Sequence, residues 1–497
     1  MDITTITPKE VFSIFHEITR IPRPSKHEEQ ICQWLQTFAK KHNIDYTVDD
    51  AMNVIMRVPA TAGYENHEGV ILQAHMDMVC EKNNDTVHDF SKDPIETYVD
   101  GDWLKAKGTT LGGDDGIGIA LALAAITSST LQHPAIECLF TVDEETGLTG
   151  AFKLKDGYLT GKRLINLDSE DDGQIFIGCA GGIDTLAKMH YTANTLNFKL
   201  STLNSQTFAC RIFVTGLTGG HSGDDINKGR ANANKIIVRF LYRIFLDPKH
   251  KIDGAQLSSI NGGNLRNAIA RECEAVVLVP MAAKEQLRIE LNHFIADIEA
   301  EYGEVEKDML IDLESIHNSP LGAQSTIHSA DAAKLIRALY ACPHGVIGMC
   351  KDMPGLVETS TNLASIKMKE GYIEINTSQR SSVESKKHDI KNQVECALAA
   401  ACDEVTHGDG YPGWAPNVHS AILETTKQAY IDLFKEEPKV LAIHAGLECG
   451  LFLEKYPYLD MVSIGPQMVG VHSPQERLSI SSTGRCWQWL QHTLEKL

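Results

Sequence analysis

The pattern of helices and strands along this chain changes twice. Up to about Tyr191, short apolar strand patterns alternate with helical ones, which is typical of an α/β sheet covered by helices. A stretch with longer strands and longer helices follows, and from about Asn417 the earlier alternation returns. We therefore expect an α/β domain that is interrupted by an inserted α+β domain and completed by the C-terminal segment.

Particular stretches of the first part predict its elements. Apolar runs predict strands at 69–73, 135–142 and 163–167, and an Ala- and Leu-rich stretch predicts a buried helix at 116–127. We place the first part of the α/β domain at 1–187, the inserted domain at 188–400 and the second part of the α/β domain at 401–497.

The composition limits which partners the protein can bind and in which cellular compartment it is expected. The 497 residues carry 46 Lys and Arg against 66 Asp and Glu, a net charge of −20, so nucleic acids and anionic membranes are unfavourable partners. No apolar run approaches the roughly 18 residues of a membrane span, and Asp2 stands where a secretory signal would be basic. The 12 scattered cysteines include no C-x-x-C pair, which indicates buried thiols and a cytoplasmic protein.

Five segments place His, Asp or Glu directly after an apolar strand pattern. The first, ILQAHMDM, contains His75 and Asp77, which would lie on one face of a strand. A metal-bound imidazole needs a partner for its second ring nitrogen, so His75 as ligand and Asp77 as its orienting partner fit a metal site. The alternative is an ordinary histidine at a strand end that pairs with an aspartate.

The second segment, GTTLGGDDGIGIA, puts Asp114 and Asp115 at the start of the helix expected at 116–127. A helix N-terminus favours one negative charge, so a capping role is the simple alternative. Two adjacent carboxylates exceed what capping needs, and a ligand shared between two cations would explain the second one.

The third segment, CLFTVDEETG, holds Asp143, Glu144 and Glu145 directly after a buried strand. Three neighbouring acids repel one another, and without cations the pKa of at least one of them would rise. A metal would relieve this repulsion and would let one glutamate act as ligand and the other as general base. A solvated loop is the alternative.

The last two segments are LINLDSEDDG, with Asp168, and VGVHSPQERLSI, with His472. Two imidazoles and several carboxylates suit zinc, cobalt or manganese, and two close cations need a shared ligand. The sequence has no H-E-x-x-H motif, no G-x-S-x-G motif and no glycine-rich loop ending in G-K-[ST]. A helix-borne zinc protease, a serine hydrolase of the elbow type and a P-loop enzyme are thereby excluded.

Together these segments resemble the aminoacyl-histidine dipeptidases, also called cytosolic non-specific or Xaa-His dipeptidases. These are two-zinc peptidases related to glutamate carboxypeptidase and carnosinase. The resemblance spans about residues 22–482, and the family's usual Asp-Asn pair reads Asp114–Asp115 here. The motifs that carry it are ILQAHMDMVCEK, GTTLGGDDGIG, TVDEETGLTGA, LINLDSEDDGQIFIGCAGG, GLTGGHSG, AIHAGLECGLF and VGVHSPQERLSI.

The resemblance implies roles for individual residues. His75 and Asp168 would hold one metal, Glu145 and His472 would hold the other, and Asp114 would bridge the two. Asp77 would orient His75, and Glu144 would be the general base. The implied fold is a zinc-peptidase α/β domain with a twisted, mostly parallel sheet and an inserted α+β lid.

The lid would supply three further residues. His221 would stabilise the oxyanion, whereas Asn267 and Arg380 would hold the substrate, with the carboxylate of the substrate as their target. A surface turn is the alternative for His221, and an ordinary ion pair is the alternative for Arg380. The roles of His444 and Glu448 stay open.

The implied activity is hydrolysis of unblocked dipeptides, including Xaa-His dipeptides, by a water shared between two divalent metal ions. Zinc is the expected metal, with cobalt and manganese as alternatives, and the expected partners are small peptide substrates. An N-acyl amino acid deacylase, a tripeptidase and a non-catalytic metal-binding protein are the rival functions. A homodimer stays open.

Overall fold

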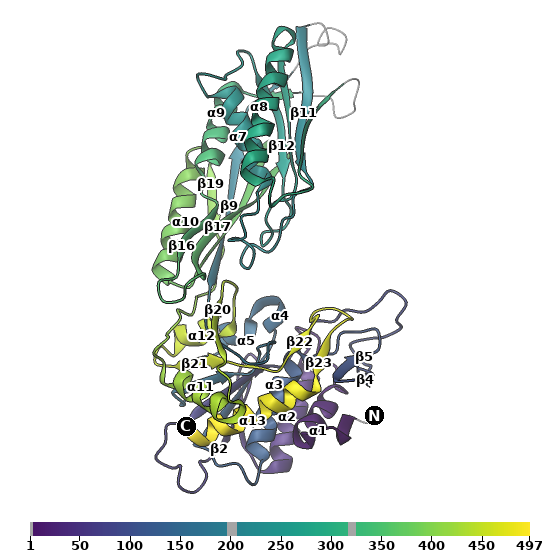
Figure 1. Cartoon of the computed structure of the whole chain (residues 1–497), viewed down its shortest axis with the longest axis vertical. Coiled ribbons are helices and arrows are strands. Elements are labelled where there is room, and N and C mark those ends of the chain that lie inside the picture. The colour runs from purple at the N-terminus through teal and green to yellow at the C-terminus, as the bar shows by residue number, and fades with distance from the viewer. Residues whose placement is uncertain (1–2, 196–205, 317–324) are drawn as a thin grey trace. The chain divides into compact units, whose positions relative to one another are not determined.

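The computed structural model describes residues 3–195, 206–316 and 325–497, which form two compact units (Figure 1). Unit 1 comprises Met1–Cys179, Trp414–Ala442 and Leu447–Leu497, and unit 2 comprises Ala180–Gly413 and Ile443–Gly446. The chain thus passes between the units at 179/180 and 413/414, where the sequence placed the passage at 187/188 and 400/401, and it returns briefly to unit 2 at Ile443–Gly446, which the sequence did not predict. The difference arises because two strands next to these points, β9 and β19, pair with each other inside the sheet of unit 2.

Unit 1 is built on an eight-stranded sheet. Its strands are, in spatial order, β1 (Asp45–Val48), β2 (Val54–Val58), β6 (Ile136–Thr141), β3 (Val70–His75), β7 (Arg163–Asn166), β21 (Asp460–Ser463), β8 (Gln174–Cys179) and β20 (Lys439–Ile443). The central strands β6, β3, β7 and β21 run parallel, and β1, β2 and β8 pair antiparallel with their neighbours.

Burial explains the centre of this sheet. Every residue of β3 and of β6 is buried, as expected for parallel strands that are covered on both faces. The helix α3 (Gly113–Thr127) packs against both of these strands and is apolar all round, so it too is buried. The strands and the helix predicted for this region are confirmed to within three residues at each end.

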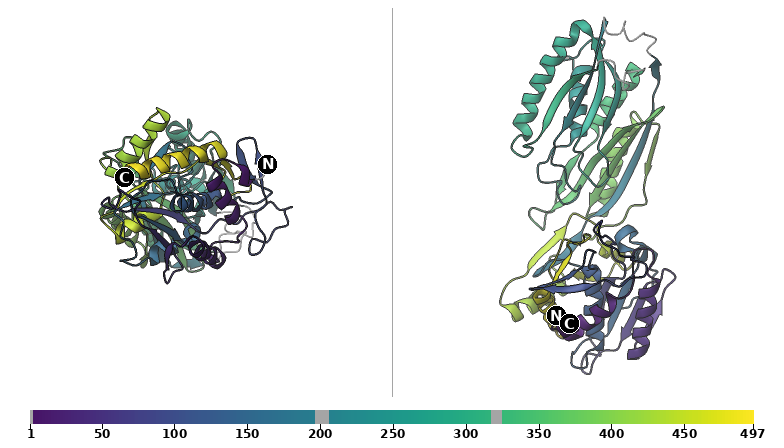
Figure 2. Two further views of the ribbon diagram at one scale, coloured as in Figure 1. Left: turned by 90° about the horizontal axis from the view of Figure 1, so that it is seen from below. Right: turned by 90° about the vertical axis from the view of Figure 1, so that its right-hand side faces the viewer.

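Seven further helices belong to unit 1: α1 (Lys9–Ile18), α2 (Glu29–His42), α4 (Glu144–Gly147), α5 (Thr149–Lys153), α11 (Ala421–Phe434), α12 (Glu448–Lys455) and α13 (Ile480–Lys496), together with a short 3-10 helix, η1 (Ile3–Thr5). The helix α11 packs against α13, which is the long yellow helix in Figure 2. A second sheet has the order β22 (Met468–Val469), β23 (Arg477–Ser479), β5 (Trp103–Ala106) and β4 (Thr97–Asp100).

Unit 2 contains a larger sheet with antiparallel pairing. Its path is β14 (Leu310–Ser315), β11 (Thr207–Thr215), β13 (Cys273–Pro280), β12 (Gln256–Gly262), β17 (Val357–Met368), β18 (Tyr372–Ser381), β9 (Gly181–His190) and β19 (Glu404–His407), and β16 (Gly345–Met349) pairs with β17. Two short strands, β10 (Ala193–Thr195) and β15 (Ser325–Ile327), pair separately.

In the described part of unit 2, four helices pack with this sheet around one hydrophobic core: α7 (Ala233–Phe245), α8 (Lys284–Tyr302), α9 (Ser329–Ala341) and α10 (Glu384–Ala399), with a 3-10 turn, η2 (Met281–Ala283), before α8. The segregation of antiparallel strands and helices is the α+β architecture expected for the insert. None of the described helices has the combination of length and hydropathy that crossing a membrane requires.

One glycine after β21 tests how tightly unit 1 is packed. A Cβ on Gly465 would lie 1.7 Å from the carbonyl oxygen of Ser169 and 2.6 Å from its carbonyl carbon, so Gly465→Ala must displace the Ser169 backbone. We expect a loss of unfolding free energy of about 1–3 kcal/mol or more, measured by urea denaturation. Gly408→Ala, whose Cβ would enter open space, is the control. Equal denaturation midpoints for the two variants would contradict this packing.

Candidate metal centre

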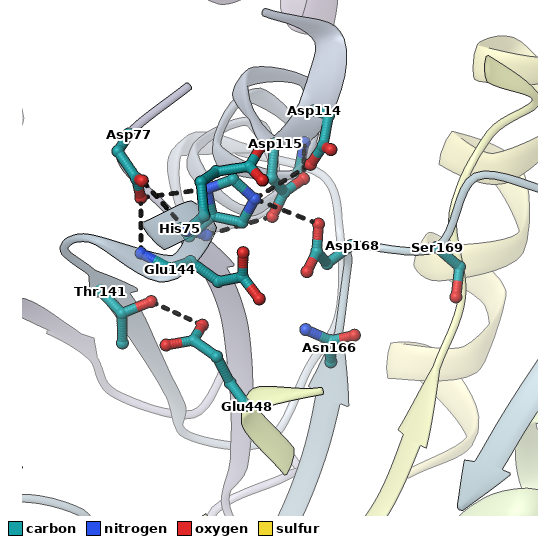
Figure 3. Close-up of polar contacts among 12 residues, drawn as sticks. His75, Asp77, Asp114, Asp115, Thr141, Glu144, Asn166, Asp168, Ser169 and Glu448 are labelled. Carbon is teal, nitrogen blue, oxygen red and sulfur yellow. Dashed lines mark hydrogen bonds and ion pairs between the residues drawn. The ribbon is translucent and has the colours of Figure 1, made fainter. Parts of the chain in front are cut away.

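The expected metal ligands of the first four segments lie at the carboxyl ends of neighbouring parallel strands or in the first turn of α3. β3 ends at His75, Glu144 and Glu145 begin α4 just after β6, and Asp168 follows β7 by two residues. Because β6, β3 and β7 are adjacent and parallel, these ends meet at one edge of the sheet. Asp114, in the first turn of α3, faces the same edge (Figure 3).

The carboxylate of Asp114 lies between two imidazoles. Its Oδ1 is 2.9 Å from Nε2 of His75, and its Oδ2 is 3.1 Å from Nε2 of His472. The two histidines are nearly 400 residues apart in the sequence, yet each directs the same ring nitrogen at one carboxylate. A carboxylate in this position can offer one oxygen to each of two cations.

Each imidazole also has a carboxylate of its own. Oδ1 of Asp168 lies 3.4 Å from Nε2 of His75, and Oε2 of Glu145 lies 3.0 Å from Nε2 of His472. The structure therefore forms two imidazole–carboxylate pairs on either side of Asp114. All five residues that the sequence suggested as metal ligands come together, and three of them, His75, Asp114 and Glu145, have ligand atoms within 4.8 Å of one another.

Asp77 is fully buried and supports two parts of this site (Figure 3). Its Oδ1 lies 3.3 Å from Nδ1 of His75 and accepts a hydrogen bond of 3.0 Å from the backbone N–H of Glu144. Its Oδ2 accepts hydrogen bonds from the backbone N–H of Glu145 and from the hydroxyl of Ser25. Asp77 thus lies against Nδ1 of His75, and its hydrogen bonds fix the turn that carries both glutamates.

Asp115 differs from its neighbour. Its Oδ2 accepts a hydrogen bond of 3.2 Å from the backbone N–H of His75, and its Oδ1 accepts one of 3.0 Å from Gly118. An oxygen of Asp115 also lies within 4.8 Å of ligand atoms of His75 and Asp168. The capping alternative considered for the aspartate pair therefore describes the second aspartate, while the first faces the imidazoles.

The site concentrates negative charge away from water. Burial raises the pKa of Asp168 to about 7, and burial also raises the pKa of Glu144, with the charges of Asp168 and Glu145 adding to the effect. Although burial opposes it, hydrogen bonds from His472 and His75 lower the pKa of Asp114. Divalent cations would relieve the repulsion among these carboxylates, and a set of two imidazoles and three carboxylates suits zinc, cobalt or manganese.

A buried polar row, of which the sequence motifs pointed only to Glu448, lies beneath these ligands (Figure 3). Glu448, at the start of α12, accepts hydrogen bonds of 2.7 Å from Nε2 of Gln73 and from Oγ1 of Thr141, and Gln73 in turn accepts one from Asn166. Burial raises the pKa of Glu448 to about 8. The available signal was a polar residue inside an apolar strand, as in VILQAH and IECLFT.

The three residues expected from the lid lie in unit 2. His221 and Ala268 form an isolated β-bridge. Asn267 is exposed, and its backbone carbonyl oxygen accepts a hydrogen bond from the backbone N–H of Ser222. Nδ1 of His221 lies 3.2 Å from a carboxylate oxygen of Asp224. His221 and Asn267 thus belong to two segments that are held together.

Arg380 lies inside β18, one residue before its end. It is 8% exposed and donates a hydrogen bond to the hydroxyl of Tyr411, while its buried Nε has no partner among the described residues. Nearby His444 has its Nε2 2.7 Å from Oγ of Ser360. Burial lowers the pKa of His444 to about 3, and the charge of Arg380 adds to this shift.

Comparison with known proteins places this geometry in a family. Residues 71–496 match the model of Peptidase family M20/M25/M40. Cytosol non-specific dipeptidase of Escherichia coli (strain K12) is 40% identical over 496 residues, which cover 100% of this chain and 99% of that protein. The crystal structure of aminoacylhistidine dipeptidase from Vibrio alginolyticus matches with a TM-score of 0.92 and 39% identity, covering 100% of this chain and 98% of the other.

A more distant structure, aminopeptidase PepT from Bacillus cereus, shares the fold at 15% identity and a TM-score of 0.57, with 99% of both chains covered. The family implies two metal ions, in agreement with the two imidazole–carboxylate pairs around Asp114. The resemblance drawn from the sequence motifs is confirmed, and the chain belongs to peptidase family M20/M25/M40.

Proposed function

We propose that this enzyme hydrolyses unblocked dipeptides, including Xaa-His dipeptides, with two metal ions. The observation that carries the proposal is the Asp114 carboxylate between His75 and His472, with a further, half-buried acid, Glu144, near His75 (Figure 3). The 40% identity over the full length to a protein named as a non-specific dipeptidase supports the substrate class.

We assign the metal ligands as one set. His75 and Asp168 would hold the first ion, His472 and Glu145 would hold the second, and Asp114 would serve both. Zinc is the metal that we propose, with cobalt or manganese as functional substitutes, because the donor set is mixed imidazole and carboxylate. Two such ions, when bound, polarise the scissile carbonyl and lower the pKa of a water molecule towards neutrality.

Glu144 then acts as the general base. It accepts a proton from the attacking water and returns it to the nitrogen of the leaving amine as the C–N bond breaks. Burial raises the pKa of Glu144, which brings a carboxylate closer to the working range of a base at neutral pH. Asp77 holds the backbone N–H of Glu144 and so fixes where this base stands.

The lid residues complete the proposed site. His221 donates to the oxyanion of the tetrahedral intermediate, and Arg380 and Asn267 bind the carboxylate of the substrate. The unpartnered Nε of Arg380 supports this role, because a buried guanidinium retains donors for a carboxylate. Dipeptides are the expected partners. We also propose a cytoplasmic location, which is supported by the relative named as a cytosol dipeptidase. A homodimer is a further proposal.

A substrate panel tests the function. Dipeptides, the corresponding tripeptides and N-acetyl amino acids are assayed with zinc, cobalt or manganese added to metal-free protein. Rapid hydrolysis of free dipeptides, abolished by chelator and restored by metal, is the expected result. Preference for tripeptides or for acetylated amino acids would assign the enzyme to one of the rival peptidase or deacylase activities, and no hydrolysis would leave a metal-binding protein.

Adjacent glutamates allow a matched test of the division of roles. Glu144→Ala should retain both metal ions and lose about 10²–10⁴-fold in kcat, because only the general base is removed. Glu145→Ala, the neighbouring control, should lose one metal equivalent. Metal content of the purified variants, measured by mass spectrometry, decides between them; a missing equivalent in Glu144→Ala would mean that the two roles are exchanged.

His221→Ala tests the oxyanion role. Because an oxyanion donor acts on the transition state more than on the substrate, kcat should fall by roughly 10²–10³-fold while KM and metal content change little. Arg380→Met is the comparison, since loss of a carboxylate contact should raise KM. Steady-state kinetics on one dipeptide give kcat and KM. A near-normal kcat in His221→Ala would mean that this histidine is an ordinary residue of a surface turn.

A further inference from the structure

Two buried side chains of opposite charge lie next to the metal ligands without being ligands themselves. Arg23 is 2% exposed and Glu476 is 3% exposed. Burial lowers the pKa of Arg23 and raises the pKa of Glu476. Burying a charge is unfavourable unless it is well hydrogen-bonded, so the contacts of these two groups indicate what they hold in place.

The carboxylate of Glu476 binds the backbone of the turn that leads into Asp114. Oε2 accepts hydrogen bonds from the N–H groups of Leu111, at 2.7 Å, and Gly112, at 3.2 Å. Oε1 accepts one from Gly113, at 2.7 Å, and a longer one from Asp114 itself, at 3.5 Å. Four consecutive N–H groups therefore converge on one carboxylate.

The guanidinium of Arg23 binds the carbonyl side of the same turn. Its Nη2 donates to the carbonyl oxygen of Gly112. Its Nη1 donates to the carbonyl oxygens of Met76, at 3.0 Å, and Asp77, at 2.6 Å. One planar side chain thus joins the segment that follows His75 to the turn that precedes Asp114.

The glycines of GGDDG leave room for this arrangement. A Cβ on Gly112, whose φ is +69°, would lie 2.5 Å from Nη2 of Arg23, and a Cβ on Gly116 would lie 2.7 Å from the same nitrogen. A Cβ on Gly113 would lie 3.2 Å from Oε1 of Glu476. A side chain at Gly112 or Gly116 would therefore displace Arg23, whereas a side chain at Gly113 would require only a small shift of Glu476.

Glu476 also anchors the last ligand segment. It lies four residues after His472, and its backbone N–H donates to the carbonyl oxygen of Ser473. Through Arg23 and Glu476, the three segments that carry His75, Asp114 and His472 are tied to one another by backbone contacts. Neither charged group replaces a ligand, so their effect on a metal acts through the position of Asp114.

We propose that Arg23 and Glu476 are positioning residues that clamp the turn Leu111–Gly113 from its two sides and so hold the Asp114 carboxylate between the two imidazoles. This inference rests on the proposed role of Asp114 as the shared ligand. A turn that is fixed before metal binding has less conformational freedom to lose when the ions arrive. Loosening the clamp should therefore weaken both metal sites together.

Glu476→Gln tests the clamp with little change in volume. A carboxamide keeps one acceptor oxygen and turns an NH₂ group towards N–H donors, so two of the four contacts are lost. We expect the affinity for both zinc ions to fall about 10–100-fold, the range typical of residues that orient metal ligands. Competition with a chromophoric chelator measures both affinities on folded protein, and kcat at saturating zinc should recover towards the wild-type value.

Glu137→Gln is the matched control. Glu137 is a buried glutamate of unit 1 that accepts backbone hydrogen bonds of 2.8 Å from Thr160 and from Gly161, but it lies near the start of β6, away from the strand ends that carry the ligands. Its substitution should lower the unfolding temperature of the metal-free protein and leave both zinc affinities unchanged. If Glu476 had a purely structural role, Glu476→Gln would behave like Glu137→Gln and lose stability without losing zinc affinity. Zinc affinities in Glu476→Gln equal to those of Glu137→Gln would therefore overturn the proposal.

Arg23→Lys is the second variant, should Glu476→Gln fail to fold. A lysine keeps the charge but cannot reach three carbonyl groups with a planar fork, so both zinc affinities should again fall together. Wild-type affinities in Arg23→Lys would contradict the clamp. Asp114→Asn is measured beside it: if that variant keeps both ions at full affinity, the proposed ligand role of Asp114 is wrong, which is a different failure from that of the clamp.

Discussion

Carboxylates that repel one another, at the carboxyl edge of the parallel strands of unit 1, are the constraint on which the rest of the site depends. Burial raises the pKa of Asp168 and of Glu144, while hydrogen bonds from two imidazoles lower the pKa of Asp114. Cations between the members of such a cluster would relieve this repulsion. Asp77, Arg23 and Glu476 form hydrogen bonds with backbone groups of the segments that carry the ligands. These bonds hold the ligand side chains close together although their charges repel.

Much of this site could be predicted from the sequence because the physics is local. An apolar run followed by His or Asp marks the carboxyl end of a buried strand, and adjacent parallel strands end at one edge of their sheet. His75, Glu145 and Asp168 come together for that reason. VGVHSPQERLSI alone indicates little more than a loop histidine, so His472 became a candidate because of the other four segments. The structure places it in a loop after the two-residue strand β22.

Other features depend on contacts that local patterns do not contain. The partners of Glu476 are backbone N–H groups more than 360 residues away, and a backbone group leaves no signature in the sequence. Which aspartate, Asp114 or Asp115, faces the two imidazoles depends on the conformation of the turn that Arg23 and Glu476 hold. The passage between the units was misplaced by 8 residues at one point and 13 at the other, because β9 and β19 join the sheet of unit 2 through long-range pairing.

The central claim is that Asp114 is shared by two metal ions, and the anomalous diffraction of crystals soaked in zinc tests it most directly. Two anomalous peaks about 3.5–4 Å apart are expected, one beside His75 and Asp168 and the other beside His472 and Glu145, each within bonding distance of one oxygen of Asp114. A single peak, or two peaks of which only one touches Asp114, would contradict it.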